Sequence, residues 1–397
     1  MPAGEPAGEP SRQGSSQRPP LHQTESQAAA SQPAASQQAG RLLVIGTGLI
    51  GTSVGMAARA AGYEVLLANR DPARLAVAVE VGAGEAWDGS SRVDLAVVAL
   101  PPGILAAEID RLQRAGVAST ITHVCSVQLQ PQREVEVLIG PWDGFVGGHP
   151  IAGRERSGPH HATGDLFQDR PWVVCPTESS AARSVAAVEA LAAACGARVS
   201  RMPAAEHDAL LARLSHVPQL VASALAAALV GLDPDDVALA GTGLRDTSRL
   251  ADSDPGLWAE IVDANPAGVA AALDAVLEPL LALRAGLAAQ EPPAEPVRAL
   301  VERGRAGRQM LAGKHGQAAV RWATVTVVVP DEPGALARLL ADAAAGGVNV
   351  EDIRVDHSPG LPLGLIDLDV APGRSNQLAD ALESRGWRAT GEEPTAS

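Results

Sequence analysis

Aromatic residues are scarce in this chain: Phe, Trp and Tyr make up 2% of its 397 residues. The apolar cores must therefore be built mainly from Ala, Val and Leu, which are common here. Cysteine is also sparse. Cys125, Cys175 and Cys195 are too few and too far apart for a disulfide framework or a zinc site, and each lies in an apolar run. We expect three buried free thiols and no metal site.

Positive charge and long apolar runs are lacking as well. The chain has 31 Lys and Arg against 46 Asp and Glu, a formal net charge of −15, which argues against a nucleic-acid-binding surface. An anionic substrate would need a local cluster of Arg. We expect no membrane span, because no apolar run is long enough to cross a bilayer. Leu220 to Leu232 is too short for one and is interpreted as a buried Ala-rich helix.

Residues 1–40 have no apolar periodicity and are rich in Pro, Gly, Ser, Gln and Ala. Such a segment buries too little surface to offset the entropy of ordering, so we expect a disordered low-complexity tail. It has no positively charged start followed by an apolar stretch, so it does not resemble a signal peptide. These features favour a cytoplasmic protein.

A strand–turn–helix–strand pattern stands out in residues 41–70. Gly46, Gly48 and Gly51 form G-x-G-x-x-G between an apolar run and a helical pattern that begins with Leu49 and Ile50. In a βαβ unit such glycines allow a tight turn, close approach of a pyrophosphate and close packing of helix on strand. Free N–H groups at the helix start would meet the phosphates. The motif alone is weak evidence, but its context predicts NAD or NADP binding.

The pattern of elements divides the rest of the chain. Apolar strands alternating with helices continue to about residue 202, which predicts a Rossmann-type doubly wound α/β sheet over 41–202. Residues 203–315 show almost only Ala/Leu-rich helical stretches, typical of an all-α domain that forms a homodimer. Residues 322–390 follow a βαββα order, which predicts a ferredoxin-like module.

The stretch GGHPIAGRERSGP closes the predicted sheet domain. His149 follows a predicted strand, at the carboxyl edge where ligands bind in open α/β sheets. A histidine there can act as a general base. Ser126 also follows a strand, and Glu155 adds charge in the loop after His149. The alternative is a structural histidine whose hydrogen bonds are satisfied within the protein.

The helical region contains two polar segments. LSHVPQL places His216 and Gln219 inside an apolar stretch, and residues 241–261 carry Arg245, Arg249 and Trp258. Two Arg in a Gly-flanked segment suit a carboxylate clamp, because guanidinium pairs bidentately with planar anions. A solvated helix start, capped by Ser253 or Asp254, explains the same residues equally well.

Together these segments resemble one family. GTGLIGTS, GGHPIAGRERSG, LSHVP, GTGLRDTSRLADSDPGLW and DEPGALARL are similar to prephenate dehydrogenase with a C-terminal ACT domain, in the family's order from Arg41 to about Arg388. The resemblance implies oxidative decarboxylation of prephenate to 4-hydroxyphenylpyruvate, a step of tyrosine biosynthesis. It also implies that an aromatic amino acid, expected to be tyrosine, binds the ACT domain around Asp331 to Gly334 as feedback control.

The resemblance also implies roles for single residues. His149 would accept the hydrogen bond from the C4 hydroxyl of the substrate as its proton is lost, with Ser126 assisting. Arg249 would bind a substrate carboxylate. The remaining pocket residues implied by the resemblance are His216, Glu155, Trp258 and, in place of the family's usual histidine, Gln219.

The chain departs from the family pattern at several positions. His123, Cys125 and Gln128 replace the usual acidic, small and lysine residues around Ser126. Asn69 and Arg70 stand where a carboxylate usually binds the ribose hydroxyls, which allows the 2′-phosphate of NADP, although Asp71 could still serve NAD.

These departures leave alternatives open. Arogenate dehydrogenase has the same chemistry with an amino substrate. A β-hydroxyacid or imine-reducing enzyme has a similar architecture, but the former would use a Lys in the helical domain, and Lys314 is the only lysine of the chain. An amino-acid sensor that has lost catalysis is a third possibility, which His149 and Arg249 argue against.

Overall fold

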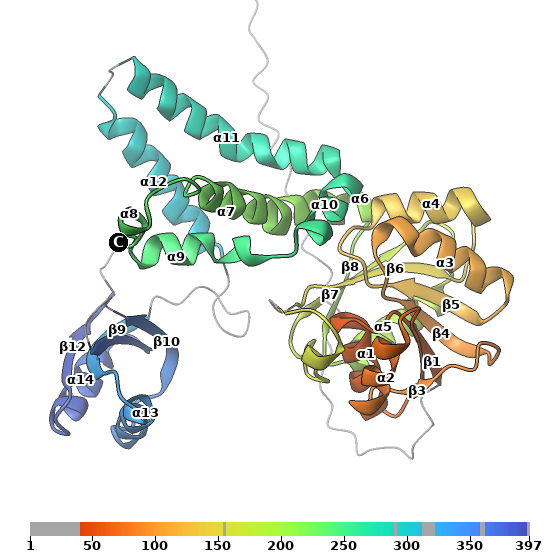
Figure 1. Cartoon of the computed structure of the whole chain (residues 1–397), viewed down its shortest axis with the longest axis horizontal. Coiled ribbons are helices and arrows are strands. Elements are labelled where there is room, and N and C mark those ends of the chain that lie inside the picture. Colours follow the sequence, from red (N-terminus) through yellow and green to blue (C-terminus); the bar gives the residue numbers. More distant parts are fainter. Residues whose placement is uncertain (1–39, 154–155, 290–291, 312–321, 358–361, 395–397) are drawn as a thin grey trace, which may run out of the picture. The chain divides into compact units, whose positions relative to one another are not determined.

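The computed structural model describes residues 40–153, 156–289, 292–311, 322–357 and 362–394 (Figure 1). The tail predicted for residues 1–40 lies almost entirely outside them. The chain divides into two compact units. The first is formed by the described residues up to Ala224 together with Leu250–Leu273, and the second by Leu225–Arg249 together with the described residues from Asp274 onward.

An eight-stranded sheet organises the first unit, in the order β3-β2-β1-β4-β5-β6-β7-β8. All neighbours pair in parallel except β6 and β7, which are antiparallel. The strands are β1 (Arg41–Ile45), β2 (Glu64–Ala68), β3 (Glu85–Ala86), β4 (Val93–Val98), β5 (Ala118–His123), β6 (Phe145–Pro150), β7 (Pro171–Pro176) and β8 (Arg198–Arg201). The order reverses between β1 and β4, which is where a dinucleotide-binding sheet places its ligand.

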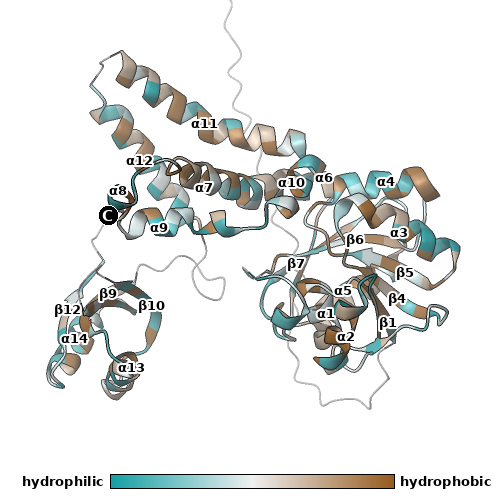
Figure 2. Ribbon diagram, viewed as in Figure 1, coloured by the Kyte–Doolittle hydropathy of each residue, from teal (hydrophilic) through white to brown (hydrophobic). Residues whose placement is uncertain are grey.

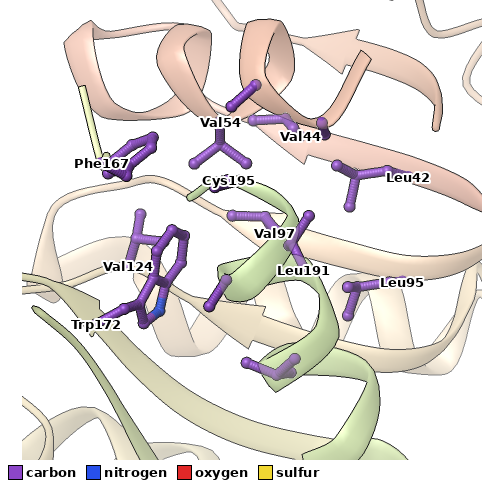
Figure 3. Packing of buried hydrophobic residues seen from close by; sticks show 14 of the residues in the cluster. Leu42, Val44, Val54, Leu95, Val97, Val124, Phe167, Trp172, Leu191 and Cys195 are labelled. Carbon is purple, nitrogen blue, oxygen red and sulfur yellow. The ribbon is translucent and has the colours of Figure 1, made fainter. Parts of the chain in front are cut away.

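Helices cover both faces of this sheet, which are apolar because parallel strands are buried on both sides. Leu42 and Val44 of β1 face one core and Leu43 and Ile45 the other. The first core, which includes Trp172, is closed by helices α1, α2 and α5 (Figure 3). The second is closed by α3, α4 and α10. The bounds are α1 (Leu49–Ala60), α2 (Pro72–Glu80), α3 (Pro102–Arg114), α4 (Leu129–Ile139), α5 (Ala182–Ala194) and α10 (Pro255–Ala264).

The Rossmann-type sheet predicted from the sequence is confirmed, and the three cysteines are buried and free as expected. The two-residue strand β3 is too short to give a periodic signal and was not predicted. His149 is also placed differently: it lies inside β6, opposite Val173 of β7, rather than after a strand. The antiparallel partner β7 extends the pairing by two residues beyond the predicted end at Gly148.

After the sheet the described chain is helical up to Gln309. The elements are α6 (Ala204–Leu211), the π-helical turn η2 (Ala212–His216), α7 (Val217–Ala227), α8 (Pro234–Val237), α9 (Thr242–Ser248), the 3₁₀ turn η3 (Arg249–Asp252), α10, α11 (Pro266–Ala288) and α12 (Ala294–Gln309). A short 3₁₀ turn η1 (Pro159–His161) also follows β6.

Several of these helices expose apolar side chains. The interpretation of Leu220–Leu232 as a buried helix is wrong, because α7 ends at Ala227 and Val230 and Leu232 are 86% and 52% exposed. Brown apolar segments likewise recur along α11 (Figure 2). Ala204–Ala227 and Pro266–Ala288 are long and apolar enough to cross a membrane by length and composition, which corrects the expectation that no segment is. Exposed apolar helices are equally expected where two copies of a chain meet.

A four-stranded antiparallel sheet with two helices ends the second unit. It consists of β9 (Ala323–Pro330), α13 (Ala335–Ala345), β10 (Val350–His357), β11 (Leu363–Val370), α14 (Ser375–Glu383) and β12 (Arg388–Glu392), with strand order β10-β11-β9-β12. This is the ferredoxin-like order. The predicted βαββα pattern omitted β12, whose sequence RATGE has no apolar alternation and which pairs with β9 at the sheet edge.

Candidate active site

The glycine loop between β1 and α1 fits a dinucleotide. Gly46 has φ +97°, and a Cβ there would overlap the carbonyl oxygen of Ala99. A Cβ on Gly48 would meet nothing within 4 Å, so the bare backbone at this position faces open space. Gly48 begins α1 with no side-chain cap, which leaves the N–H groups at the helix start, including those of Leu49 and Ile50, for a phosphate. The loop therefore has the shape and the donors that a pyrophosphate needs.

The end of β2 carries the residues expected at the ribose. Asn69 donates from Nδ2 to Oγ1 of Thr47 at 2.7 Å and accepts from the Asp71 N–H at 2.9 Å, so its amide holds the turn together. Asp71 caps α2, accepting from the N–H groups of Ala73 and Arg74. Arg70 between them is exposed.

His149 is the central titratable group at the carboxyl end of β6. Its side chain is buried, and its pKa is held well below the usual 6.5, first by burial and then by repulsion from His207, His123 and His216. Burial penalises the imidazolium, so His149 is neutral at pH 7. A neutral imidazole can accept a proton, as a general base must.

His149 is the first member of a buried hydrogen-bond chain. Its Nδ1 lies 2.9 Å from Nε2 of His207, and Nδ1 of His207 lies 2.8 Å from Oδ1 of Asp208. The backbone N–H groups of Gln128 and Leu129 donate to the Asp208 carboxylate, each at 2.9 Å. Helix α6 carries His207 and Asp208 and contacts both α4 and β7. These contacts place the hydrogen-bond chain at the edge of the sheet.

The segment after β5 lies in the same region. Ser126 is partly buried, and Gln128 donates to the carbonyl oxygens of Cys125 and Gly148, linking this segment to β6. His123 accepts from the Cys125 N–H, and burial lowers its pKa to about 3. Gln128 therefore replaces the family's lysine with a neutral side chain that ties two strand ends together.

His216 and Trp258 come together from η2 and α10. Their rings lie 6.2 Å apart at an interplanar angle of 73°, an edge-to-face arrangement. Burial lowers the pKa of His216, and its Nδ1 is buried without a hydrogen-bond partner among the described residues. An unpaired buried nitrogen of this kind is costly unless a ligand or water satisfies it, so His216 is suited to hold a substrate.

Gln219, predicted as a substrate-pocket residue, forms hydrogen bonds within the protein. Its Nε2 donates to the Leu250 carbonyl oxygen at 2.7 Å, and its Oε1 accepts from Ser253 at 3.1 Å. Both ends of the amide thus hold η3 against α7.

The remaining predicted residues lie elsewhere. Arg249 is exposed at the start of η3 and, like Arg245 of α9, belongs to the second unit. Glu155 lies outside the described residues. Asp331 and Gly334 precede α13, and Gly334 has φ +85°. Within the described part of the chain, no group of three or more His, Cys, Asp or Glu is arranged to hold a metal ion.

Sequence reasoning missed His207 and Asp208. The local signal was the segment AAEHDALL, where Glu206, His207 and Asp208 interrupt an apolar helix about two turns before LSHVP. Both side chains are buried, which single-sequence periodicity did not reveal.

A dinucleotide-binding sheet whose carboxyl edge carries a buried neutral histidine defines an oxidoreductase that uses NAD or NADP. Sequence comparison gives the family. Residues 54–201 match the family "Prephenate dehydrogenase, nucleotide-binding domain", and residues 203–300 match "Prephenate dehydrogenase, dimerization domain". The chain is 34% identical over 356 residues to the "Probable prephenate dehydrogenase NovF" of Streptomyces niveus, covering 87% of this chain and 98% of that protein. The chain belongs to the prephenate dehydrogenase family.

Solved structures agree with this assignment. A prephenate dehydrogenase from Aquifex aeolicus, in complex with hydroxyphenyl propionate and NAD+, aligns with a TM-score of 0.60 and 26% identity over 69% of this chain and all of that one. Arogenate dehydrogenase from Synechocystis aligns with a TM-score of 0.58 and 26% identity over 68% of this chain and all of that one.

Proposed function

We propose that this protein oxidatively decarboxylates prephenate to 4-hydroxyphenylpyruvate with NAD or NADP as hydride acceptor. The observation that carries the proposal is His149, a buried neutral imidazole at the carboxyl edge of a dinucleotide-binding sheet. Family membership supports the reaction, and the glycine loop supports the cofactor.

The residues of the chain have distinct parts in this reaction. The C4 hydroxyl of prephenate donates to His149, which takes the proton as hydride leaves C4 for the nicotinamide. CO2 leaves C1, its bonding electron pair passes through the ring to the C4 oxygen, and the ring becomes aromatic. The proton held by His149 returns to that oxygen, which gives the phenol of the product. Ser126 assists at the hydroxyl, while His216 with Trp258 lines the substrate side. Arg249 of the second unit and Glu155, which lies outside the described residues, are proposed to bind substrate from the family resemblance alone.

Arogenate is the second candidate substrate. It differs from prephenate by an amino group in place of the side-chain carbonyl, so the choice depends on groups around that side chain. His123, Cys125 and Gln128 leave no lysine near Ser126, and the neutral Gln219 is committed to Leu250 and Ser253. The loss of the lysine charge at Gln128 is the feature that favours arogenate.

For the cofactor we propose NADP. The Asp71 carboxylate, the candidate for binding ribose hydroxyls, is engaged as the α2 cap and lies 3.6 Å from Nε of Arg74. Asn69 is held by Thr47. Arg70 is exposed beside these groups and could pair with a 2′-phosphate.

We further propose that tyrosine binds the C-terminal module and inhibits the enzyme. A small cavity lined by Asp331, Leu336 and Val355, among others, lies beside the turn before α13. The turn offers fewer free donors than expected from its sequence, because the N–H groups of Asp331, Glu332 and Ala335 already donate to backbone carbonyls. The N–H groups of Gly334, Leu336 and Ala337 are the donors left for an amino-acid carboxylate.

The homodimer is part of the same proposal. The match to a dimerization domain over residues 203–300 and the exposed apolar side chains of that region support it.

The test of the function is a steady-state comparison of prephenate and arogenate, each with NAD and NADP. We expect turnover of prephenate, with release of CO2 and formation of reduced cofactor. If neither prephenate nor arogenate is turned over with either cofactor, the proposal is overturned.

A further inference from the structure

We propose that His207 and Asp208 are positioning residues that fix the tautomer of His149, so that its Nε2 is the bare nitrogen that accepts the substrate proton. The reaction itself is taken from the proposed function. The residues of the hydrogen-bond chain all lie in the first unit.

The chain is anchored at Asp208. Its carboxylate accepts from the backbone N–H groups of Gln128 and Leu129, and its side chain is 4% exposed. Backbone N–H groups can only donate, so they favour the ionised carboxylate, which can only accept. The 2.8 Å contact with His207 therefore requires that Nδ1 of His207 carries the proton.

The next link follows from the chemistry of neutral imidazole, in which one nitrogen donates and the other accepts. With its proton on Nδ1, His207 presents the lone pair of Nε2 at 2.9 Å from Nδ1 of His149. His149 must then donate from Nδ1, and its Nε2 keeps the lone pair. No described residue forms a hydrogen bond with that nitrogen, which leaves it for the substrate hydroxyl.

The same chain stabilises the product of proton transfer. When Nε2 of His149 takes the C4 hydroxyl proton, the imidazolium still donates from Nδ1 to His207, and its charge faces the Asp208 carboxylate through that ring. Among the described residues, the other titratable groups that interact with His149 are His123 and His216, and burial keeps both neutral near pH 7. Asp208 is then the one counter-charge among these groups. Without it a buried cation would form uncompensated.

Asp208→Asn is the direct test. An amide has one acceptor atom for the three donors, so in one orientation its NH2 donates to Nδ1 of His207. His207 then donates from Nε2, and the His149 proton moves to Nε2, the wrong nitrogen. We expect kcat with prephenate to fall about 10²- to 10⁴-fold, with KM changed less than about threefold, as for a base held in the wrong tautomer. Asn265→Ala is the matched control. Asn265 donates to the backbone oxygen of Asp208, so this variant disturbs the same residue but leaves the hydrogen bonds between His149, His207 and the Asp208 carboxylate in place. It should retain kcat within about threefold.

The tautomer can be read without substrate, by ¹⁵N NMR of the full-length protein labelled at histidine. The His149 signals are identified by their loss in His149→Asn. The wild type should show a protonated Nδ1 and a bare Nε2 for His149, and Asp208→Asn should show the reverse. A wild-type His149 protonated on Nε2, or a kcat loss in Asp208→Asn with the tautomer unchanged, would overturn the proposal. If the tautomers are as expected but prephenate is not turned over, the chain is supported and the proposed function fails.

A second pair of variants covers the case in which Asp208→Asn does not fold. His207→Gln keeps an oxygen that can accept from Nδ1 of His149, whereas His207→Leu fills a similar volume without an acceptor. The Gln variant should retain at least about tenfold more kcat than the Leu variant. Equal losses in two folded variants would show that His207 only fills space.

Discussion

Gly51 packs so closely on Gly46 that a Cβ on Gly51 would overlap the Gly46 carbonyl oxygen. Gly48, between them, has nothing within 4 Å of the same position. The two sites should therefore respond differently to the same substitution. Gly51→Ala should lower the melting temperature, because backbone must shift to admit the methyl group. Gly48→Ala should leave the melting temperature unchanged and weaken NAD(P) binding about tenfold or more, since the methyl group occupies the pyrophosphate's approach.

Thermal melts without cofactor and fluorescence titration with cofactor separate the two effects. Unchanged cofactor affinity in Gly48→Ala would mean that the phosphate does not approach this backbone.

His149→Asn removes the proposed base. We expect kcat to fall roughly two to four orders of magnitude, as for a positioned general base, with cofactor binding unchanged. Because the pKa of His149 lies well below 6.5, wild-type kcat/KM should not decline as pH falls from 8 through 6.5 on account of this group. Stopped-flow and steady-state rates measured against pH give the kcat of the variant and the pH dependence of wild-type kcat/KM. Near wild-type kcat in the variant would exclude His149 as the base.

The sequence was sufficient for most of the sheet because its central strands contain short apolar runs, as in residues 95–98 of β4, and the glycines stand between one such run and a helix. It was not sufficient for β3 and β12, which have two and five residues with no apolar pattern. Both are edge strands that form because a neighbouring strand offers free backbone groups, and that is a tertiary property.

The same limit applies to the site. His149 could be predicted because it lies in a recognisable sequence motif at the end of a strand, although the strand runs through it rather than stopping before it. His207 could not, because its role depends on α6 packing against β7, which no local pattern encodes. For Asp71 and Gln219 the residue type suggested ligand binding, but the structure uses the one as a helix cap and the other as a clamp between α7 and η3. A polar side chain has several possible partners, and only the fold decides between them.

Arg70→Ala tests the cofactor. If Arg70 pairs with the 2′-phosphate, the variant should weaken NADP binding by about 1.5–3 kcal/mol, the range of a charge-assisted hydrogen bond, and leave NAD nearly unchanged. Arg59→Ala is a control, because that arginine donates to the Gly82 carbonyl oxygen elsewhere on the sheet domain. Dissociation constants for both cofactors are the measurement. Equal effects of Arg70→Ala on NAD and NADP would show that it does not recognise the 2′-phosphate.

The buried His123 should make stability depend on pH. Burial lowers its pKa to about 3, whereas in the unfolded chain it titrates near 6.5. Between these values the unfolded state binds the extra proton, so the free energy of unfolding falls as pH falls below 6.5, by about 1.4 kcal/mol per pH unit for this residue. His123→Asn should flatten the slope by that amount between pH 6 and 5, and leave it unchanged between pH 7.5 and 8.5, where the imidazole is neutral in both states. Urea denaturation across pH measures this. An equal slope in both proteins would mean that His123 is protonated in the fold.

Tyrosine inhibition can be tested at Gly334, the residue before α13. Its φ of +85° is in the left-handed region that glycine adopts freely, and a Cβ there would lie near Arg338. Gly334→Val should therefore strain the turn and displace the donors at the start of α13. Tyrosine should inhibit the wild type by roughly 5- to 150-fold, the range of a 1–3 kcal/mol coupling, and should not inhibit the variant. Gly373→Val is the matched control, because Gly373 also has positive φ but lies between β11 and α14. It should carry a similar backbone strain and keep the inhibition. Activity against tyrosine concentration, with sedimentation to verify the dimer, decides the matter: equal loss of inhibition in both variants would mean that general destabilisation of the module, rather than a site before α13, is responsible.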